Sequence, residues 1–243
     1  MMMEHWKAFK KPFDDVYKLA VGVALSSIPI VRWVSKGYML ENSGIGAEKP
    51  SDEMPGWEDW RTLWVKGFHA ALIMIAYNLP AIIVGIVGVS IASAGLISAY
   101  SAILTPDIME EMRSGMLDLK TITELTVSNA EAIMPHLYRL MPAVAIALLL
   151  KIMASILTPI ATLQYLERGR MSDAFKFKRI LRVVASLDYV IAWFTVQAYT
   201  MVAGIMFAMI PLAGYGTAYF ITGIYAYTVY GQVYRNQSSD TVM

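Results

Sequence analysis

Residues 68–104 read FHAALIMIAYNLPAIIVGIVGVSIASAGLISAYSAIL, a stretch without a single Asp, Glu, Lys or Arg. A helix needs about 20 apolar residues to cross the hydrocarbon core of a bilayer, so this stretch can cross at least once. As one unbroken helix it would be about 55 Å long, nearly twice that thickness. Because Asn78-Leu79-Pro80 and Gly85 to Gly88 offer two candidate breaks, the sequence predicts two crossings here.

The rest of the chain has the same character. Hydrophobic residues make up 57% of it and charged residues 16%, whereas an average soluble domain is about a quarter charged. Residues 141–164 and 189–232 contain a single charged residue, Lys151. We therefore expect an all-α, polytopic transmembrane helix bundle, a multi-pass protein of the cell (plasma) membrane surrounded by membrane lipid.

Polar segments divide this single predicted transmembrane domain, residues 1–243. Trp57, Trp60 and Trp64 recur at helical spacing, so they are predicted interfacial anchors on one helix face. Thr105 is predicted to cap a short helix. The predicted polar segments are a cytoplasmic N-terminus (1–15), an interfacial loop with an amphipathic helix (41–66), an external acidic segment (105–136), a cytoplasmic basic amphipathic segment (167–188) and a cytoplasmic tail (235–243).

Orientation follows from the basic residues between Arg168 and Arg182, because Lys and Arg near a span are retained in the cytoplasm. With both termini inside, the charge distribution predicts six spans. The stretch Tyr38-Met39-Leu40-Glu41 is weakly similar to Tyr165-Leu166-Glu167. This similarity between the two halves of the chain suggests a 3+3 inverted repeat. The alternative is four spans, with residues 16–40 lying in or re-entering the interface and residues 68–104 forming one kinked helix.

Lys151 is the most informative single residue. It follows Arg139 by about 12 residues, roughly 18 Å of helix, and so lies near mid-bilayer. A charge there costs several kcal/mol unless it is paired, hydrated or neutralised, and intramembrane charges often mark solute or proton pathways. The competing interpretation is a lysine turned into the bundle against carbonyls, Tyr hydroxyls or Asn78. Gln197 is a further mid-span polar residue, and for Asn78 and Gln197 an interhelical hydrogen bond is the favoured role.

Small residues recur on two predicted spans, where they are expected to let neighbouring backbones approach closely. The first set falls at helical spacing in the apolar stretch, and the second is interleaved with tyrosines near the C-terminus. These predicted packing positions are Gly88, Ala92, Gly95 and Ala99, and Gly216, Gly223 and Gly231.

Several classes of chemistry find no support. The chain has no Cys, which excludes disulfides and thiolate sites. His5, His69 and His136 are isolated in sequence, so neither a metal site nor any other cofactor is predicted. No nucleotide-binding loop or catalytic serine set occurs, and the net charge of +1 gives no reason to expect nucleic acid. We therefore expect a protein that is not an enzyme.

Three stretches carry a resemblance to a known family. They are Ser27-Ile28-Pro29-Ile30 to Gly37-Tyr38-Met39-Leu40-Glu41, Pro55-Gly56-Trp57-Glu58-Asp59-Trp60 continuing to Val65-Lys66-Gly67-Phe68, and Arg168-Gly169-Arg170-Met171-Ser172-Asp173-Ala174-Phe175 with Lys178-Arg179-Ile180. At these residues the chain resembles a prokaryotic membrane family catalogued as domain of unknown function 4013, over about residues 15–235. The resemblance implies a polytopic fold in a prokaryotic envelope, and it brings no activity or catalytic residues.

Two functions compete on this basis. The first is a non-catalytic structural scaffold or complex subunit that forms a homo-oligomer or holds a partner membrane protein. The second is a small-solute transporter or channel with a polar pathway near Lys151. A continuous polar cavity reaching Lys151 would favour transport, and a dry site would favour the scaffold.

Overall fold

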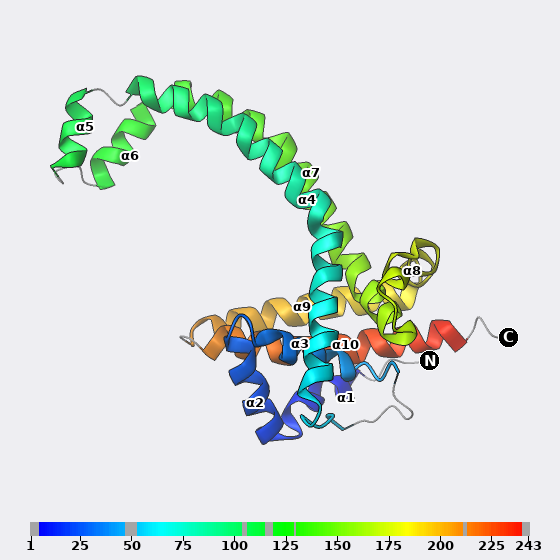
Figure 1. The fold of residues 1–243 in the computed structure, drawn as a ribbon. Helices are drawn as coiled ribbons and strands as arrows, with labels where there is room; N and C mark the ends of the chain where they lie inside the picture. The colour runs from blue at the N-terminus through cyan, green and yellow to red at the C-terminus, as the bar shows by residue number, and fades with distance from the viewer. Residues whose placement is uncertain are drawn as a thin grey trace. The chain divides into compact units, whose positions relative to one another are not determined.

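The computed structural model describes residues 5–46, 53–103, 106–114, 119–128, 130–210 and 213–239. Within these ranges the ordered backbone is helical and contains no strand, as Figure 1 shows. The chain forms two compact units. Unit 1 combines Met1–Tyr77 with Ala154–Met243, and unit 2 is Asn78–Met153.

The N-terminal part of unit 1 is a series of short helices. Asp15 caps the second α-helix, since its carboxylate accepts a hydrogen bond from the backbone N–H of Lys18 at 3.0 Å. That helix ends just before Pro29, whose ring disfavours helical backbone at the residue preceding it. The elements are α1 (His5–Lys10), the 3₁₀ turn η1 (Lys11–Phe13), α2 (Val16–Ser27) and α3 (Arg32–Glu41).

Helices α2 and α3 fold back on each other as a hairpin. The hydroxyls of Ser26 and Ser35 lie 2.6 Å apart, and Ser35 also donates to the carbonyl of Gly22 at 3.1 Å. With 12 and 10 residues, the two helices are about 18 and 15 Å long. Neither is therefore long enough to cross a bilayer of about 30 Å by itself.

Helix α4 (Trp60–Ile103) runs for 44 residues with Pro80 inside it. The break predicted at Asn78-Leu79-Pro80 or at Gly85 to Gly88 was wrong, because both sites are helical. In an apolar environment a backbone N–H or C=O without a hydrogen bond is costly. A helix therefore keeps its remaining backbone hydrogen bonds on both sides of a single proline. Asp59 begins the helix by accepting from the backbone N–H of Thr62 at 3.0 Å.

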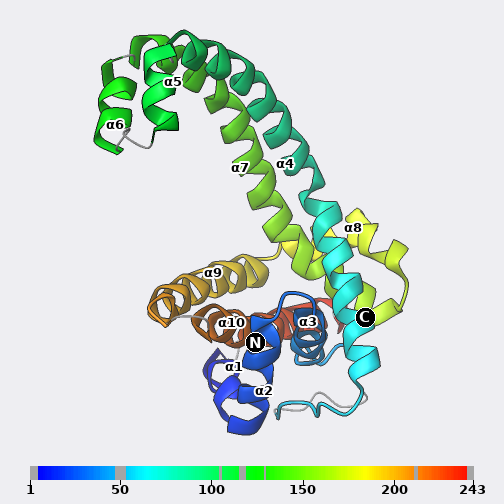
Figure 2. The same ribbon diagram turned by 60° about the vertical axis from the view of Figure 1, so that its left-hand side comes forward.

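Unit 2 is a long helical hairpin. The upper parts of α4 and α7 run antiparallel, and two short helices lie at the tip (Figures 1 and 2). Thr105, the predicted cap, falls outside the described residues. The remaining helices of this part of the chain are α5 (Pro106–Arg113), α6 (Leu119–Ser128) and α7 (Ala130–Arg168), which extends into unit 1.

The C-terminal helices complete unit 1. Ser186 caps α9 by accepting from the backbone N–H of Tyr189 at 3.3 Å. Helix α10 is its buried centre: it packs against α9, α2 and α3, and Phe220, Ile224 and Tyr230 are among its core side chains. The elements are η2 (Met171–Phe175), α8 (Phe177–Val184), α9 (Leu187–Ala208) and α10 (Ala213–Ser239).

Three of the described helices are long and apolar enough to cross a membrane. The described parts of these helices are Trp60–Ala99, Ile133–Arg168 and Leu187–Ala208, and each contains an apolar window of 18 residues. Few residues of these stretches are buried within the protein, between 6% and 17% of the most apolar window. Apolar surface on this scale needs lipid or another protein chain to cover it, so the fold is that of an all-α membrane protein.

Candidate functional site

The structure brings two of the predicted polar residues together. The ammonium of Lys151 on α7 donates to the side-chain oxygen of Asn78 on α4, at 2.9 Å. Both residues belong to unit 2. From the sequence, a contact with Asn78 was one interpretation of Lys151 that required no function. The structure contains this contact.

A groove of about 360 Å³ runs along the hairpin beside this pair. Lys151 and Asn78 are its polar lining residues. The other lining residues are glycine or have alkyl side chains. The apolar lining comprises Ala81, Ile82, Gly85, Val89, Leu140, Ala143, Val144, Ala147 and Leu148. A hydrated solute would meet one polar pair and nothing else that could replace its water.

Gln197 does not join this site. It is an exposed residue of α9 in unit 1, whereas Lys151 and Asn78 lie in unit 2. No hydrogen bond within the described residues ties its side chain to Lys151.

The small residues of α4 face α7 to different degrees. A Cβ built on Gly88 would lie 2.3 Å from the Cβ of Ala143, and one on Gly95 would lie 2.1 Å from the His136 ring. Ala92 is buried and Ala99 is partly exposed. The hairpin is therefore tightest at Gly88 and Gly95.

The glycines of α10 lie against the α2–α3 hairpin and the loop after it. A Cβ would lie 2.2 Å from the Ser27 hydroxyl at Gly216 and 2.2 Å from the Met39 sulfur at Gly223. At Gly231 it would lie 2.2 Å from the Ser43 carbonyl oxygen. The Gly231 contact is the least adaptable of the three, because backbone cannot move aside as a side chain can.

The three tryptophans do not share one helix. Trp60 and Trp64 are exposed residues of α4, while Trp57 precedes that helix. Trp57 stacks on Tyr38 with ring centroids 3.8 Å apart. The prediction of one aromatic helix face was therefore wrong at Trp57, because the preceding Pro55-Gly56 pair disfavours helix and the partly buried Trp57 packs against the core instead.

Sequence reasoning missed the closest helix contact of unit 1. A Cβ on Gly37 would lie 1.9 Å from the carbonyl oxygen of Leu63, and one on Gly67 would lie 1.8 Å from that of Trp33. Helices α3 and α4 therefore touch backbone to backbone. Gly37 and Gly67 are 30 residues apart in the sequence, so no spacing within one helix could have revealed the pair.

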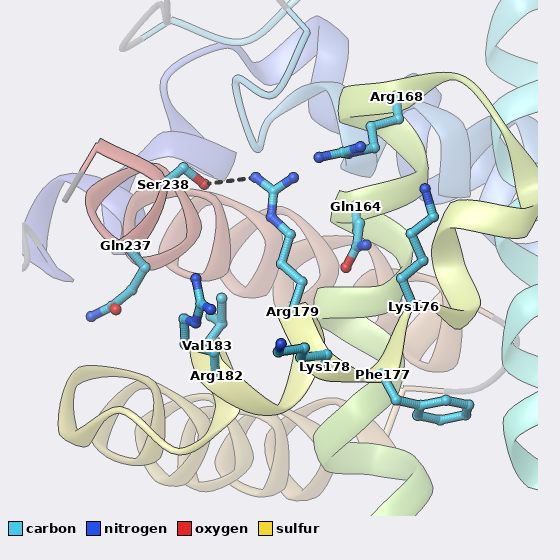
Figure 3. Close-up of a pocket in the computed structure, with 10 residues that line it drawn as sticks. All are labelled: Gln164, Arg168, Lys176, Phe177, Lys178, Arg179, Arg182, Val183, Gln237 and Ser238. Carbon is cyan, nitrogen blue, oxygen red and sulfur yellow. Dashed lines mark hydrogen bonds between the residues drawn. The ribbon is translucent and has the colours of Figure 1, made fainter. Parts of the chain in front are cut away.

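It also missed a basic pocket of about 740 Å³ in unit 1, between the end of α7, η2, α8 and the end of α10 (Figure 3). Arg179 pairs with both carboxylate oxygens of Glu167, at 2.8 and 3.0 Å. Lys176 pairs with Asp173, and this contact holds the pKa of the Asp173 carboxyl below its usual range. The pocket is lined by Gln164, Arg168, Lys176, Phe177, Lys178, Arg179, Arg182, Val183, Gln237 and Ser238.

The imidazoles lie in separate places. His5 hydrogen-bonds Tyr225 at 3.1 Å, His69 hydrogen-bonds Tyr165 at 2.8 Å, and His136 faces Gly95. Among the described residues no three His, Asp or Glu side chains come together as metal ligands would.

One protein family matches the chain. Its description is protein of unknown function (DUF4013), and the match covers residues 21–212, well over half of the sequence. The chain belongs to this family. No curated protein and no solved structure matches it.

The three stretches that carry the DUF4013 resemblance all lie in unit 1. The first two are in contact, because the Tyr38 hydroxyl donates to the Pro55 carbonyl at 2.8 Å. The third supplies Arg168 and η2, and the hydroxyl of Tyr77 donates to the carbonyl of Ala174 there at 2.7 Å. The lining of the basic pocket thus includes Arg168 of the third stretch. The Lys151 pair, which also lies within the matched residues 21–212, belongs to unit 2.

Proposed function

We propose that this DUF4013 protein is a non-catalytic scaffold of a prokaryotic cell membrane, which self-associates through its helical hairpin. The observation that carries the proposal is the apolar groove at Lys151. A solute or ion pathway through a membrane is lined by several polar or charged groups. Lys151 instead has one amide partner, and the remaining lining of its groove is apolar.

The length of the hairpin supports self-association. Residues 68–103 of α4 contain no Asp, Glu, Lys or Arg, and these 36 residues form about 54 Å of helix. The hydrocarbon core is about 30 Å thick, and helix tilt reaches only about 40°. Part of this apolar surface therefore lies beyond the lipid and needs a protein to cover it.

Ile91 and Ile97 mark that part of the surface. Gly95 faces His136, so this end of α4 lies level with the stretch of α7 that carries His136 and Arg139. Because such polar residues are expected outside the hydrocarbon core, we propose that this level lies at or past the membrane surface. Ile91 and Ile97 nevertheless remain 62% and 68% exposed, and we propose that a second copy covers them.

For topology we favour the four-span alternative. Arg235, near the end of α10, donates to the carbonyl of Ser43. Residues 41–66 and the end of α10 then share one membrane face, whereas the six-span arrangement puts them on opposite faces. In this proposed arrangement the two short helices α2 and α3 re-enter the membrane, α4, α7 and α9 each cross it once, and the less apolar α10 is the fourth crossing.

The second candidate function remains a small-solute transporter or channel. It is favoured by the position of Lys151, about 18 Å from Arg139 along the helix and so near mid-bilayer. In this case the groove beside Lys151 and Asn78 would widen into a hydrated path during transport.

The scaffold proposal is tested by cross-linking in membranes, since the natural chain has no cysteine. We expect Ile97→Cys to give a disulfide-linked dimer on mild oxidation. The control is Leu149→Cys, 64% exposed on α7 at the level of the lipid, which should stay monomeric. Failure of Ile97→Cys to cross-link, together with the mass of a single chain in lipid nanodiscs, would contradict self-association.

A further inference from the structure

Gln164 is a buried amide without a partner. Its side chain is 0% exposed, and neither its nitrogen nor its oxygen has a hydrogen-bond partner in the part of the chain that the structure describes. Leaving such a group unsatisfied costs about 1–3 kcal/mol. Gln164 lines the basic pocket, and Figure 3 places its amide between Arg179 and Lys176. The amide is therefore set for a polar ligand in the pocket.

The charges around the pocket favour an anion. Five cationic side chains line it, those of Arg168, Lys176, Lys178, Arg179 and Arg182. The carboxylates in contact with them are Glu167 and Asp173. Five positive and two negative charges leave an excess of three. Lys178 and Arg182 have no carboxylate within 4 Å among the described residues, so they are available to a ligand.

The same helix carries apolar side chains beside its charges. Phe177 and Leu181 on α8 are 50% and 53% exposed. A helix with Lys and Arg on one side and exposed Phe and Leu on the other lies in the membrane interface. Gln164 and Arg168 lie near the C-terminal end of α7, where the uncharged run 152–166 ends, and such a charged end is expected at the level of the headgroups.

We infer that the basic pocket binds the headgroup of an anionic, hydroxyl-bearing phospholipid, of the phosphoglycerol type. Lys178 and Arg182 neutralise the phosphate, and the amide N–H of Gln164 donates to one of its oxygens. The amide oxygen of Gln164 accepts from a headgroup hydroxyl. Phe177 and Leu181 lie against the acyl chains.

The test uses purified protein in detergent, with thermal stability measured as short-chain lipids are added. Phosphatidylglycerol should raise the melting temperature of the wild type saturably, and phosphatidylcholine should not. The double variant Lys178→Gln, Arg182→Gln should bind phosphatidylglycerol more weakly by a factor on the order of ten or more. The matched control, Arg113→Gln with Lys120→Gln, removes the same charge from unit 2 and should retain wild-type binding.

Gln164→Leu separates binding from folding. Removal of an unsatisfied buried amide should leave the lipid-free protein as stable as the wild type or more so, while the shift caused by phosphatidylglycerol is reduced. Inorganic phosphate provides the second arm. Equal stabilisation by phosphate and by phosphatidylglycerol would overturn the lipid as the ligand, and equal stabilisation by both phospholipids would overturn the site itself.

Discussion

Lys151 is an ammonium in an apolar helix, and among the described residues the Asn78 amide is its hydrogen-bond partner. At the mid-bilayer position expected from the sequence, a charge costs several kcal/mol unless it is paired, hydrated or neutralised. The residue is therefore either tolerated for local packing or kept for a function that needs the charge.

We expect Lys151→Met to leave thermal stability unchanged or to raise it, because the variant removes a charge at nearly constant volume. In the scaffold interpretation, vesicles containing wild type or variant are equally impermeable to ions and small solutes. Flux measured with purified wild-type protein and lost in Lys151→Met would instead establish the transport function.

Gly95 permits the close approach of α4 and α7. A larger side chain there meets the His136 ring, so Gly95→Leu should lower the free energy of unfolding by about 1–3 kcal/mol. Ile97→Leu, a change of shape at an exposed position, is the control. Thermal unfolding in detergent compares them, and equal melting temperatures would mean that the Gly95 face does not pack.

At the scale of elements, the contact of α3 with α4 depends on two glycines. Gly37 of α3 lies against the backbone carbonyl of Leu63 on α4, and Gly67 of α4 lies against that of Trp33 on α3. Two helices can come this close only where neither has a side chain in between. This contact secures the α2–α3 hairpin against a long apolar helix.

We expect Gly67→Ala to destabilise unit 1 by about 1–3 kcal/mol, since even one methyl group would force the two backbones apart. Gly85→Ala is the matched control on the same helix, because a Cβ at Gly85 has no atom within 4 Å. There the higher helix propensity of alanine should raise stability by up to about 1 kcal/mol. The free energy of unfolding of both variants is measured by denaturation. Equal changes in the two variants would be incompatible with the close α3–α4 contact.

At the scale of the whole molecule, the charged ends of several helices meet. The Tyr234 hydroxyl donates to Glu167 at 2.9 Å, and the same carboxylate binds Arg179. The contact between Arg235 and the carbonyl of Ser43 then joins the end of α10 to residues 41–66, which the six-span prediction put on opposite faces. A shared polar face of this kind is expected on one side of a membrane.

Single cysteines at Ser114, Ser172 and Glu58 test this topology with an impermeant thiol reagent on intact cells. We expect position 114 to label, since it lies in the predicted external segment, and positions 172 and 58 to remain unlabelled. Labelling at position 58 would support six spans. All three cysteines should react after the cells are permeabilised, which controls for access.

The membrane environment, the helical class and the family could be predicted from the sequence. Long runs without charge, such as residues 68–104, are incompatible with a soluble fold, because so much apolar surface cannot be left in water. The mid-bilayer position of Lys151 was inferred from the rise of a helix, which is the same in every sequence, and it stays a prediction. These conclusions depend on composition and local geometry alone.

The tertiary structure alone decided which residues meet. Whether Pro80 ends a helix or lies inside it depends on the cost of free backbone groups in the surroundings, so α4 is continuous although its sequence suggests a break. Packing brings together Gly37 and Gly67, which are far apart along the chain. It also gathers Gln164, Lys178 and Arg182 around one pocket, although nothing in their sequence positions marks them as a set. Periodicity reports the neighbours within one helix, whereas the contacts that build a site join helices whose separation in the sequence carries no such signal.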